Sequence, residues 1–306
     1  ALLDLVAAGP CRDVVVVGAG YIGLEMAEAF VDRGARVTLV DGAPRPLRGV
    51  DDEVADRVAE VLVRYGVTLR LGARVEGFGD HVVHLADGDL RADLVILGTG
   101  VRPASALAAD AGLDLGARDA IAVDHRQRTS AEGVYAAGDC ADVFHLVTKR
   151  RVHVALGTVA NKTGAVAGTN LGGGYATFPG VLGTAITRIC EVEIGRTGVS
   201  SREAADAGIE VEVTDVEATS RAGYFPGAEP VLARLLTERG TGRLVGGQIV
   251  GADRVGKQVD VVAVAITAGW TAAELAQADL GYAPSVTPMW SPFHAAARSA
   301  ARAACA

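Results

Sequence analysis

The run VVVVGAGYIGLEMAEAF, residues 14–30, predicts the fold more directly than any other part of the sequence. Its four valines are typical of a strand that is buried on both faces of a parallel sheet. A GxGxxG pattern follows at once, and the next residues predict a helix that ends at Gly34. Strand, glycine turn and helix in this order are the first half of a dinucleotide-binding βαβ unit.

Each glycine of this run has its own predicted role. Gly18 permits the tight turn, Gly20 lets the backbone approach a pyrophosphate, and Gly23 lets the helix pack closely on the strand. The amides and the dipole at the helix N-terminus favour an anion there. Asp41 ends the next predicted strand, residues 35–41, where its carboxylate can accept hydrogen bonds from ribose hydroxyls. The same charge would repel a 2′-phosphate, so NADH is favoured over NADPH.

Length, composition and charge exclude several classes of protein. A chain of 306 residues has room for two or three domains. It has neither an apolar run that approaches the roughly 18 residues of a membrane span nor an export signal, so a cytoplasmic protein is expected. The net charge of −8 argues against nucleic acid as a partner. No CxxC pair is present, so neither a metal site nor a redox dithiol is expected within the chain. The four cysteines are Cys11, Cys140, Cys190 and Cys305.

The middle of the chain contains the stretch TSAEGVYAAGDCAD, residues 129–142. It predicts a strand over residues 134–137 and a helix that begins at Gly138 and Asp139. A further helix is expected from Val152 towards Leu171. Because glycine in a helix interior costs about 1 kcal/mol relative to alanine, close packing against a sheet or a ligand is expected at the glycines of this helix. These are Gly157, Gly164 and Gly168.

From Tyr175 onward the pattern changes to that of an appended α+β module. Four segments predict strands, in part by the alternation of half-exposed antiparallel strands. They are residues 184–195, 209–219, 231–238 and 242–251. Ser200 with Glu203, and Thr271 with Glu274, have the spacing of capping boxes, which predicts helix starts at both places. A helix is also expected from about Arg254 to Ala268.

Five segments resemble the pyridine nucleotide–disulfide oxidoreductase family, and more narrowly its CoA-disulfide reductase, NADH oxidase and NADH peroxidase branch. They occur in the family's order and the resemblance covers essentially the whole chain. The segments are GAGYIGLEMAEAF (18–30), LGTGVRPAS (97–105), TSAEGVYAAGDCAD (129–142), GTAITRICEVEIGRTG (183–198) and DLGYAP (279–284).

The resemblance implies an α/β fold with a Rossmann-type NAD(P)H-binding domain over residues 1–117. The second segment of an FAD-binding domain would cover residues 118–174, and a C-terminal α+β dimerisation domain would cover residues 175–306. A homodimer is therefore expected. Members of the family begin with a separate FAD fingerprint and a redox-active cysteine, and this chain has a single glycine fingerprint. The expectation is that it lacks the N-terminal FAD half.

The resemblance also implies cofactor-binding residues. Tyr21 would stack over the flavin and move aside for nicotinamide, and Glu25 would face the carboxamide; an exposed loop aromatic and an ordinary helix carboxylate are the alternatives. Gly138 and Asp139 would contact the ribityl and phosphate part of FAD. The expected NAD(P)H and FAD residues are Gly18, Gly20, Tyr21, Ile22, Gly23, Glu25, Asp41, Gly98, Gly100, Gly138 and Asp139.

Two tyrosines of the C-terminal module, Tyr224 and Tyr282, resemble the pair that assists reduction of CoA disulfide in a partner subunit. Tyrosine can donate a proton to a departing thiolate, and amphipathic packing at an interface is the alternative role. His145 is expected to be a satisfied core or surface histidine rather than a flavin contact.

The function expected from the resemblance is a CoA-disulfide reductase-like enzyme that passes electrons from NADH through FAD to a disulfide. NADH oxidase or peroxidase activity, with oxygen or peroxide as acceptor, is the first alternative. A flavin-free, NAD-binding dimeric scaffold is the second. A variant with FAD itself on Gly18–Gly23 suits the Tyr21-Ile22 pair less well.

Overall fold

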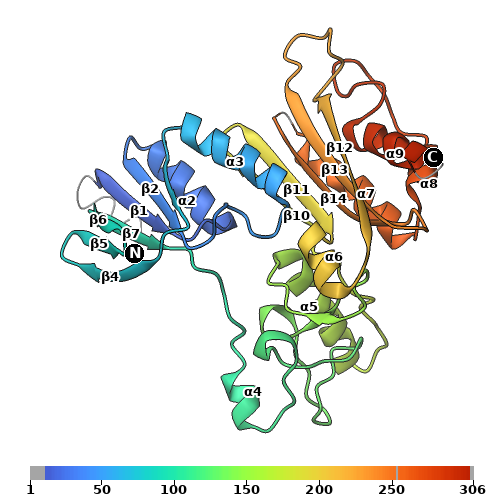
Figure 1. Cartoon of the computed structure of the whole chain (residues 1–306). Helices are drawn as coiled ribbons and strands as arrows, with labels where there is room; N and C mark the ends of the chain where they lie inside the picture. The colour runs from blue at the N-terminus through green and yellow to red at the C-terminus, as the bar shows by residue number, and fades with distance from the viewer. Residues whose placement is uncertain (1–10, 253, 304–306) are drawn as a thin grey trace.

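The structure, a computed structural model, describes residues 11–252 and 254–303. Cys305 therefore lies outside the described residues. Figure 1 shows three regions: an N-terminal region in blue and teal, a middle region in green, and a C-terminal region in orange and red. Helix α6 (Ser201–Ala207) lies where the C-terminal region approaches the other two. No helix among the described residues is long and apolar enough to span a membrane.

The N-terminal region is built on a four-stranded parallel sheet of order β3-β2-β1-β7. Its strands are β1 (Asp13–Val17), β2 (Arg36–Asp41), β3 (Thr68–Leu71) and β7 (Leu94–Leu97). The valines of β1 pair with β2 on one side and with β7 on the other, which explains why both faces of this strand are apolar. The carboxyl ends of β1, β2 and β7 therefore meet at one edge of the sheet.

Two helices and a small antiparallel sheet accompany this parallel sheet. Helix α2 (Tyr21–Val31) follows the glycine turn as predicted, and α3 (Asp52–Arg64) buries an apolar stripe that includes Val54, Val58, Val61 and Leu62. The antiparallel sheet consists of β4 (Val75–Gly79), β5 (Val82–Leu85) and β6 (Gly88–Arg91).

In the middle region the structure corrects two predictions. Residues 134–137 do not form a strand, because Tyr135 alone makes an isolated bridge, to Arg128. An apolar run becomes a strand only where a neighbouring strand offers a ladder of hydrogen bonds, and composition does not reveal that neighbour. Gly138 opens only the short 3₁₀ turn η2 (Gly138–Cys140), not a longer helix. The region also contains α4 (Ala106–Asp110), η1 (Ala117–Asp119), β8 (Val143–Phe144) and β9 (Arg151–Val152).

The glycine-containing helix of this region is α5 (Gly157–Leu171), which begins five residues later than expected. Val152 instead pairs with Val143 in the β8–β9 ladder, so it is unavailable to the helix. Close packing of Gly157, Gly164 and Gly168 against a sheet is wrong for the described chain, because a Cβ added at any of them would meet no protein atom within 4 Å. Packing against a ligand stays a prediction.

The C-terminal region is a five-stranded antiparallel sheet of order β10-β11-β14-β13-β12. Its strands are β10 (Ala185–Ile189), β11 (Val192–Gly198), β12 (Val211–Thr219), β13 (Pro230–Glu238) and β14 (Leu244–Gly251). Both predicted capping boxes are confirmed, at the starts of α6 and α8 (Ala272–Leu275). The predicted helix near residues 254–268 is η3 (Gly256–Gln258) followed by α7 (Val259–Thr267). Helix α9 (Pro292–Ala303) was not predicted.

Successive side chains of β13 point to opposite faces of this sheet. Val231, Ala233 and Leu235 pack with α7, α8 and α9, whereas Leu232 belongs to a core that it shares with α2 and α3 of the N-terminal region. The N-terminal and C-terminal regions therefore have one continuous apolar core across their junction. Arg234 lies on the same side of the strand as Leu232, so its guanidinium enters that junction.

Candidate functional site

The glycine turn between β1 and α2 has the geometry of a tight dinucleotide-binding turn. Gly18 has φ +108°, and a Cβ there would lie 2.2 Å from the Gly98 carbonyl oxygen. A Cβ on Gly23 would lie 1.8 Å from the Gly18 carbonyl oxygen, so helix and turn approach closely there. Gly20 is the N-cap of α2, and a Cβ on it would meet nothing within 4 Å. The turn is thus closed on its inner side and open at Gly20, where a ligand would approach.

Asp41 is held at the end of β2 by the turn itself. Its Oδ2 accepts a hydrogen bond from the Ala19 amide at 2.7 Å, and its Oδ1 accepts from the Ala43 amide at 2.7 Å and from Arg48 at 3.0 Å. Burial alone would raise the pKa of Asp41, but these donors outweigh it and hold the pKa below its usual value. Asp41 is therefore ionised at neutral pH, with part of its charge offset by Arg48.

A cleft of about 550 Å³ lies over this turn at the carboxyl edge of the parallel sheet. Open α/β sheets bind ligands at this edge. Besides the glycine turn and Asp41, the cleft is lined by Leu47, Arg48 and Gly49 from the loop after β2 and by Arg74 from the segment between β3 and β4. Gly98 and Gly100 line it from the loop after β7, and Gly100 has φ +94°. Arg48 and Arg74 are exposed, so the cleft offers two cations to an anionic ligand.

The first turn of α2 places the other predicted residues at or near the cleft. Tyr21 lines it and is half-buried, whereas the Ile22 side chain is 57% exposed. Burial raises the pKa of the Tyr21 hydroxyl, while the nearby Arg196 lowers it and Glu203 raises it. Glu25 accepts a hydrogen bond from the Thr187 hydroxyl of β10 at 2.9 Å, so it faces the C-terminal sheet.

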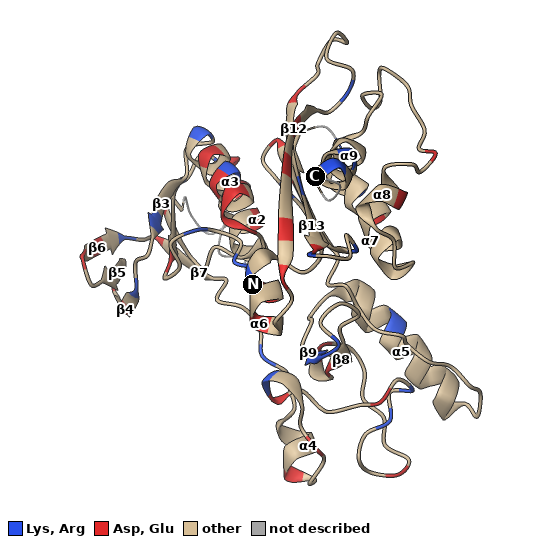
Figure 2. Cartoon of the chain, turned by 45° about the vertical axis from the view of Figure 1, so that its right-hand side comes forward, with Lys and Arg blue, Asp and Glu red and all other residues tan. Residues whose placement is uncertain are grey.

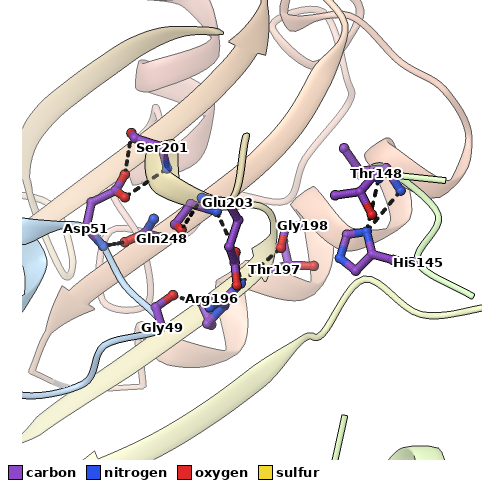
Figure 3. A network of polar contacts seen from close by, with 12 residues as sticks. Gly49, Asp51, His145, Thr148, Arg196, Thr197, Gly198, Ser201, Glu203 and Gln248 are labelled. Carbon is purple, nitrogen blue, oxygen red and sulfur yellow. Dashed lines mark hydrogen bonds and ion pairs between the residues drawn. The ribbon is translucent and has the colours of Figure 1, made fainter. Parts of the chain in front are cut away.

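Arg196 of β11 joins the C-terminal sheet to the cleft. Its guanidinium donates to the carbonyl oxygens of Gly49 and Gly198 and to Glu203 Oε2 at 2.7 Å (Figure 3). The Ser200 amide donates to the same Glu203 oxygen at 2.8 Å. We call Gly49, Arg196 and Glu203 the Arg196 cluster. It connects the cleft wall to the N-terminus of α6.

A second polar group, which we call the Arg234 cluster, lies beside it. Asp51 accepts two hydrogen bonds from Ser201, at 2.9 and 2.8 Å, and its amide donates to Gln248 Oε1 at 2.7 Å (Figure 3). Arg234 contacts Asp51 at 3.2 Å, and it also contacts Glu53 and Asp215. Figure 2 shows acidic residues along both α3 and β12, which supply these carboxylates.

Gly138 and Asp139 lie in the middle region and their known contacts are local. Gly138 has φ +76°, and its amide donates to the Thr163 hydroxyl of α5 at 3.0 Å. The Asp139 carbonyl oxygen is 2.8 Å from His153 Nε2, and the Asp139 residue is exposed. Nearby, the glycines of α5 have open space around them.

The structure brings Tyr224 and Tyr282 together, although they are 58 residues apart in sequence. Their hydroxyl oxygens are 3.4 Å apart and both side chains are exposed. The hydrogen bond with Tyr224 raises the pKa of Tyr282 above its ordinary value. The pair therefore presents two phenol groups on the surface, and the Tyr282 hydroxyl keeps its proton at neutral pH.

His145 is a buried core residue, as expected. Its Nδ1 accepts from the amides of Val147 and Thr148, each at 3.2 Å, and burial lowers its pKa (Figure 3). Cys190 is also buried, and burial together with nearby carboxylates raises its pKa to about 12. Because the thiolate is the nucleophilic form, Cys190 is unsuited to redox chemistry.

Four arginines at or near the site were not singled out in the sequence: Arg48, Arg74, Arg196 and Arg234. Arg234 had a visible signal, because it interrupts an otherwise apolar strand at VLARLLTE, and a buried charge needs partners. Arg48, Arg74 and Arg196 had none, since all three belong to stretches of mixed polarity. Among the described residues, no group of three or more histidine, cysteine or acidic side chains is arranged to hold a metal ion.

Comparison with known proteins agrees with this geometry. Residues 3–164 match the family described as pyridine nucleotide-disulphide oxidoreductase, and residues 184–292 match its dimerisation domain. An NAD(P)H sulfur oxidoreductase (CoA-dependent) of Pyrococcus abyssi is 43% identical over 94% of this chain and 65% of the relative. An NADH oxidase of Methanocaldococcus jannaschii is 37% identical over 98% of this chain and 68% of the relative.

Among solved structures, an NAD-dependent persulfide reductase from A. fulgidus is 37% identical, with a TM-score of 0.95 over 99% of this chain and 57% of that protein. The chain thus spans about two thirds of the length of the curated relatives, and less of this structure. The matches to both family domains and the identity across nearly all of the chain show that it belongs to the pyridine nucleotide-disulphide oxidoreductase family.

Proposed function

We propose that this chain acts in an FAD-dependent oxidoreductase that passes electrons from NAD(P)H to a sulfur acceptor of the CoA-disulfide type. The observation that carries the proposal is the cleft over Gly18–Gly23, in a chain whose C-terminal module also pairs Tyr224 with Tyr282. The CoA-dependent sulfur oxidoreductase of P. abyssi, at 43% identity, supports this class of acceptor.

In this proposal the cleft binds the nicotinamide dinucleotide. The amides at the N-terminus of α2 would donate to the pyrophosphate near Gly20, and Asp41 would accept from a ribose hydroxyl. Tyr21 would shield the nicotinamide position from water, with Ile22 and Glu25 beside it. When bound, the dinucleotide supplies a hydride and FAD relays the electrons to the acceptor. NADH is the favoured donor, because the Asp41 carboxylate would repel the 2′-phosphate of NADPH. Arg48 and Arg74 line the same cleft, and their positive charges would weaken that repulsion.

The proposed division of labour keeps the boundaries expected from the sequence, although α4 packs with the middle region. Residues 1–117 bind the dinucleotide, residues 118–174 contact FAD through Gly138 and Asp139, and residues 175–306 pair two subunits in a homodimer. Tyr224 and Tyr282 would donate a proton to the departing thiolate across that dimer. A reducing, cytoplasmic setting is part of the proposal, since Cys140 and Cys190 have free thiols.

Steady-state kinetics with conservative tyrosine variants test this role. In the protein that contains this chain, Tyr282→Phe and Tyr224→Phe should each lower turnover with CoA disulfide by about 100-fold or more, the usual scale of general acid catalysis. NADH binding should not change. Tyr175→Phe is the matched control, because Tyr175 is about as exposed as Tyr224 and its ring contacts Arg126 instead of the pair. Unaltered turnover in both tyrosine variants would reject the acid role.

The M. jannaschii relative, named an NADH oxidase, supports oxygen as a second candidate acceptor. An absorbance spectrum and product analysis distinguish the candidates. A yellow protein that oxidises NADH with oxygen but not with CoA disulfide is an oxidase. A colourless protein that binds NADH without turnover is a scaffold.

A further inference from the structure

The loop between β2 and α3 forms one wall of the nucleotide cleft, and two contacts near its middle hold it. On the inner side, the Leu47 amide donates to the Ala19 carbonyl oxygen of the glycine turn at 2.9 Å. On the outer side, the Gly49 carbonyl oxygen accepts from Arg196 of β11. Leu47 and Gly49 both line the cleft. The position of this wall therefore depends on a side chain of the C-terminal sheet.

The Arg196 side chain is also held by contacts other than its hydrogen bond to Gly49. Its side chain is 11% exposed, and a guanidinium at that depth must be paired and hydrogen-bonded. Glu203 supplies the charge at 2.7 Å, and the Gly198 carbonyl oxygen accepts at 3.1 Å. Glu203 is in turn held by the capping box of α6. The planar fork of the guanidinium is thus oriented by α6 and directed at the cleft wall.

The contact with Gly49 is close enough that a side chain there would displace the Arg196 guanidinium. A Cβ on Gly49 would lie 2.7 Å from Arg196 Nη1, and its three nearest atoms all belong to Arg196. Packing this close transmits a displacement of either group to the other. Tyr21, which also lines the cleft, lies within the electrostatic reach of Arg196 and Glu203.

We propose that Arg196 is a positioning residue for dinucleotide binding, acting through the Gly49 carbonyl oxygen to hold the Leu47–Gly49 wall of the cleft. The inference rests on the proposed function, because it presumes that the cleft binds the dinucleotide. In this proposal the C-terminal sheet contributes to cofactor binding as well as to subunit pairing.

Three variants of the full protein test the proposal. Arg196→Lys keeps the charge beside Glu203 but loses the fork that reaches Gly49 and Gly198 together. Gly49→Ala disturbs the same contact by adding a methyl group at Gly49, and it keeps the arginine at position 196. Arg57→Ala is the control, because the Arg57–Glu217 ion pair crosses the same junction between α3 and β12 without lining the cleft.

The readouts are the dissociation constant of NADH, measured by isothermal titration calorimetry, and the separate KM and kcat for NADH. Arg196→Lys and Gly49→Ala should each weaken NADH binding and raise KM by about 5- to 20-fold, the scale of one hydrogen bond to a charged group. Because the reacting groups are not touched, kcat should stay within about twofold. Arg57→Ala should bind NADH like the wild type.

The outcomes separate this inference from the proposed function. If the wild type does not bind NADH, the proposed function fails. If the wild type binds NADH and both cluster variants match Arg57→Ala in NADH affinity, even with lowered thermal stability, Arg196 has a structural role only and the inference is overturned. Circular dichroism shows which variants are folded, and if Arg196→Lys is not, Gly49→Ala alone decides the result.

Discussion

Removal of Arg234 gives a sharp test of the junction between the N-terminal and C-terminal regions. The Arg234 side chain is 5% exposed and contacts Asp51, whose side chain is 6% exposed, at 3.2 Å. Its other partners, Glu53 and Asp215, are 57% and 40% exposed, so solvent screens these two pairs. Arg234→Met keeps the apolar stem and removes the charge together with the hydrogen bonds that the guanidinium donates to Asp215. The change therefore leaves one buried carboxylate without its cation.

The expected loss follows from these burial values. Each exposed pair contributes less than about 1 kcal/mol, whereas breaking a buried pair costs about 3–5 kcal/mol. Asp51 keeps two hydrogen bonds from Ser201, at 2.9 and 2.8 Å, which places the expected loss near the lower limit. We expect Arg234→Met to lower the free energy of unfolding by about 3 kcal/mol. Arg57→Met, which breaks the exposed Arg57–Glu217 pair, should lower it by less than about 1 kcal/mol.

Guanidinium denaturation of both variants measures the difference. A double variant, Arg234→Met with Asp51→Asn, checks the cause, because the asparagine side chain is neutral and can still form a hydrogen bond with Ser201. It should recover at least about 1 kcal/mol of the loss, since the uncompensated charge is gone. The reasoning is refuted if Arg234→Met unfolds within about 1 kcal/mol of Arg57→Met, or if the second substitution makes the loss larger.

Three further predictions concern the turn, the Arg196 cluster and Cys190. Gly18→Ala should lower stability by about 2 kcal/mol or more, because φ is +108° and the Gly98 oxygen is 2.2 Å from the new Cβ, whereas Gly20→Ala should melt like the wild type and bind NADH more weakly. Burial would raise the pKa of Glu203, but Arg196 and Ser200 outweigh it and lower the pKa. Its contribution to stability is thus complete above the unfolded pKa of about 4.3 and is lost as pH falls through the lower folded value. In acid titrations followed by circular dichroism, the stability advantage of the wild type over Glu203→Gln should shrink below about pH 4, and a constant difference down to about pH 2 would contradict this. Cys190, with a pKa of about 12, should react with iodoacetamide only after unfolding, as peptide mass mapping will show.

Short-range sequence patterns correctly predicted those elements whose stabilising features lie within a few residues of one another. The βαβ unit at residues 14–41 follows from a valine run, a glycine turn and an amphipathic period that lie within a few residues of one another. Capping boxes at Ser200 and Thr271 are equally local, and both are confirmed. The strand expected at residues 134–137 is wrong because a strand also needs a neighbour, and the described chain supplies a bridge at Tyr135 alone.

The cleft over the glycine turn could be located from sequence, but its Leu47–Gly49 wall could not. The spacing of Gly18, Gly20 and Gly23 identifies the turn, and Asp41 follows at the end of the next strand. The arginine that holds the cleft wall belongs to a strand of another region, and GRTG at 195–198 offers no signal of its purpose.

The sequence alone determined the βαβ unit, the family membership and the C-terminal α+β module of this protein. Only the tertiary structure showed that Arg196 of β11 lies beside the cleft. It also placed Arg234 at the junction of the N-terminal and C-terminal regions. The physical reason is distance along the chain. Gly49 and Arg196 are 147 residues apart, and their contact arises from the apolar core that α2 and α3 share with the C-terminal sheet. A hydrogen bond of that kind depends on how two regions pack, which no local pattern of residues specifies.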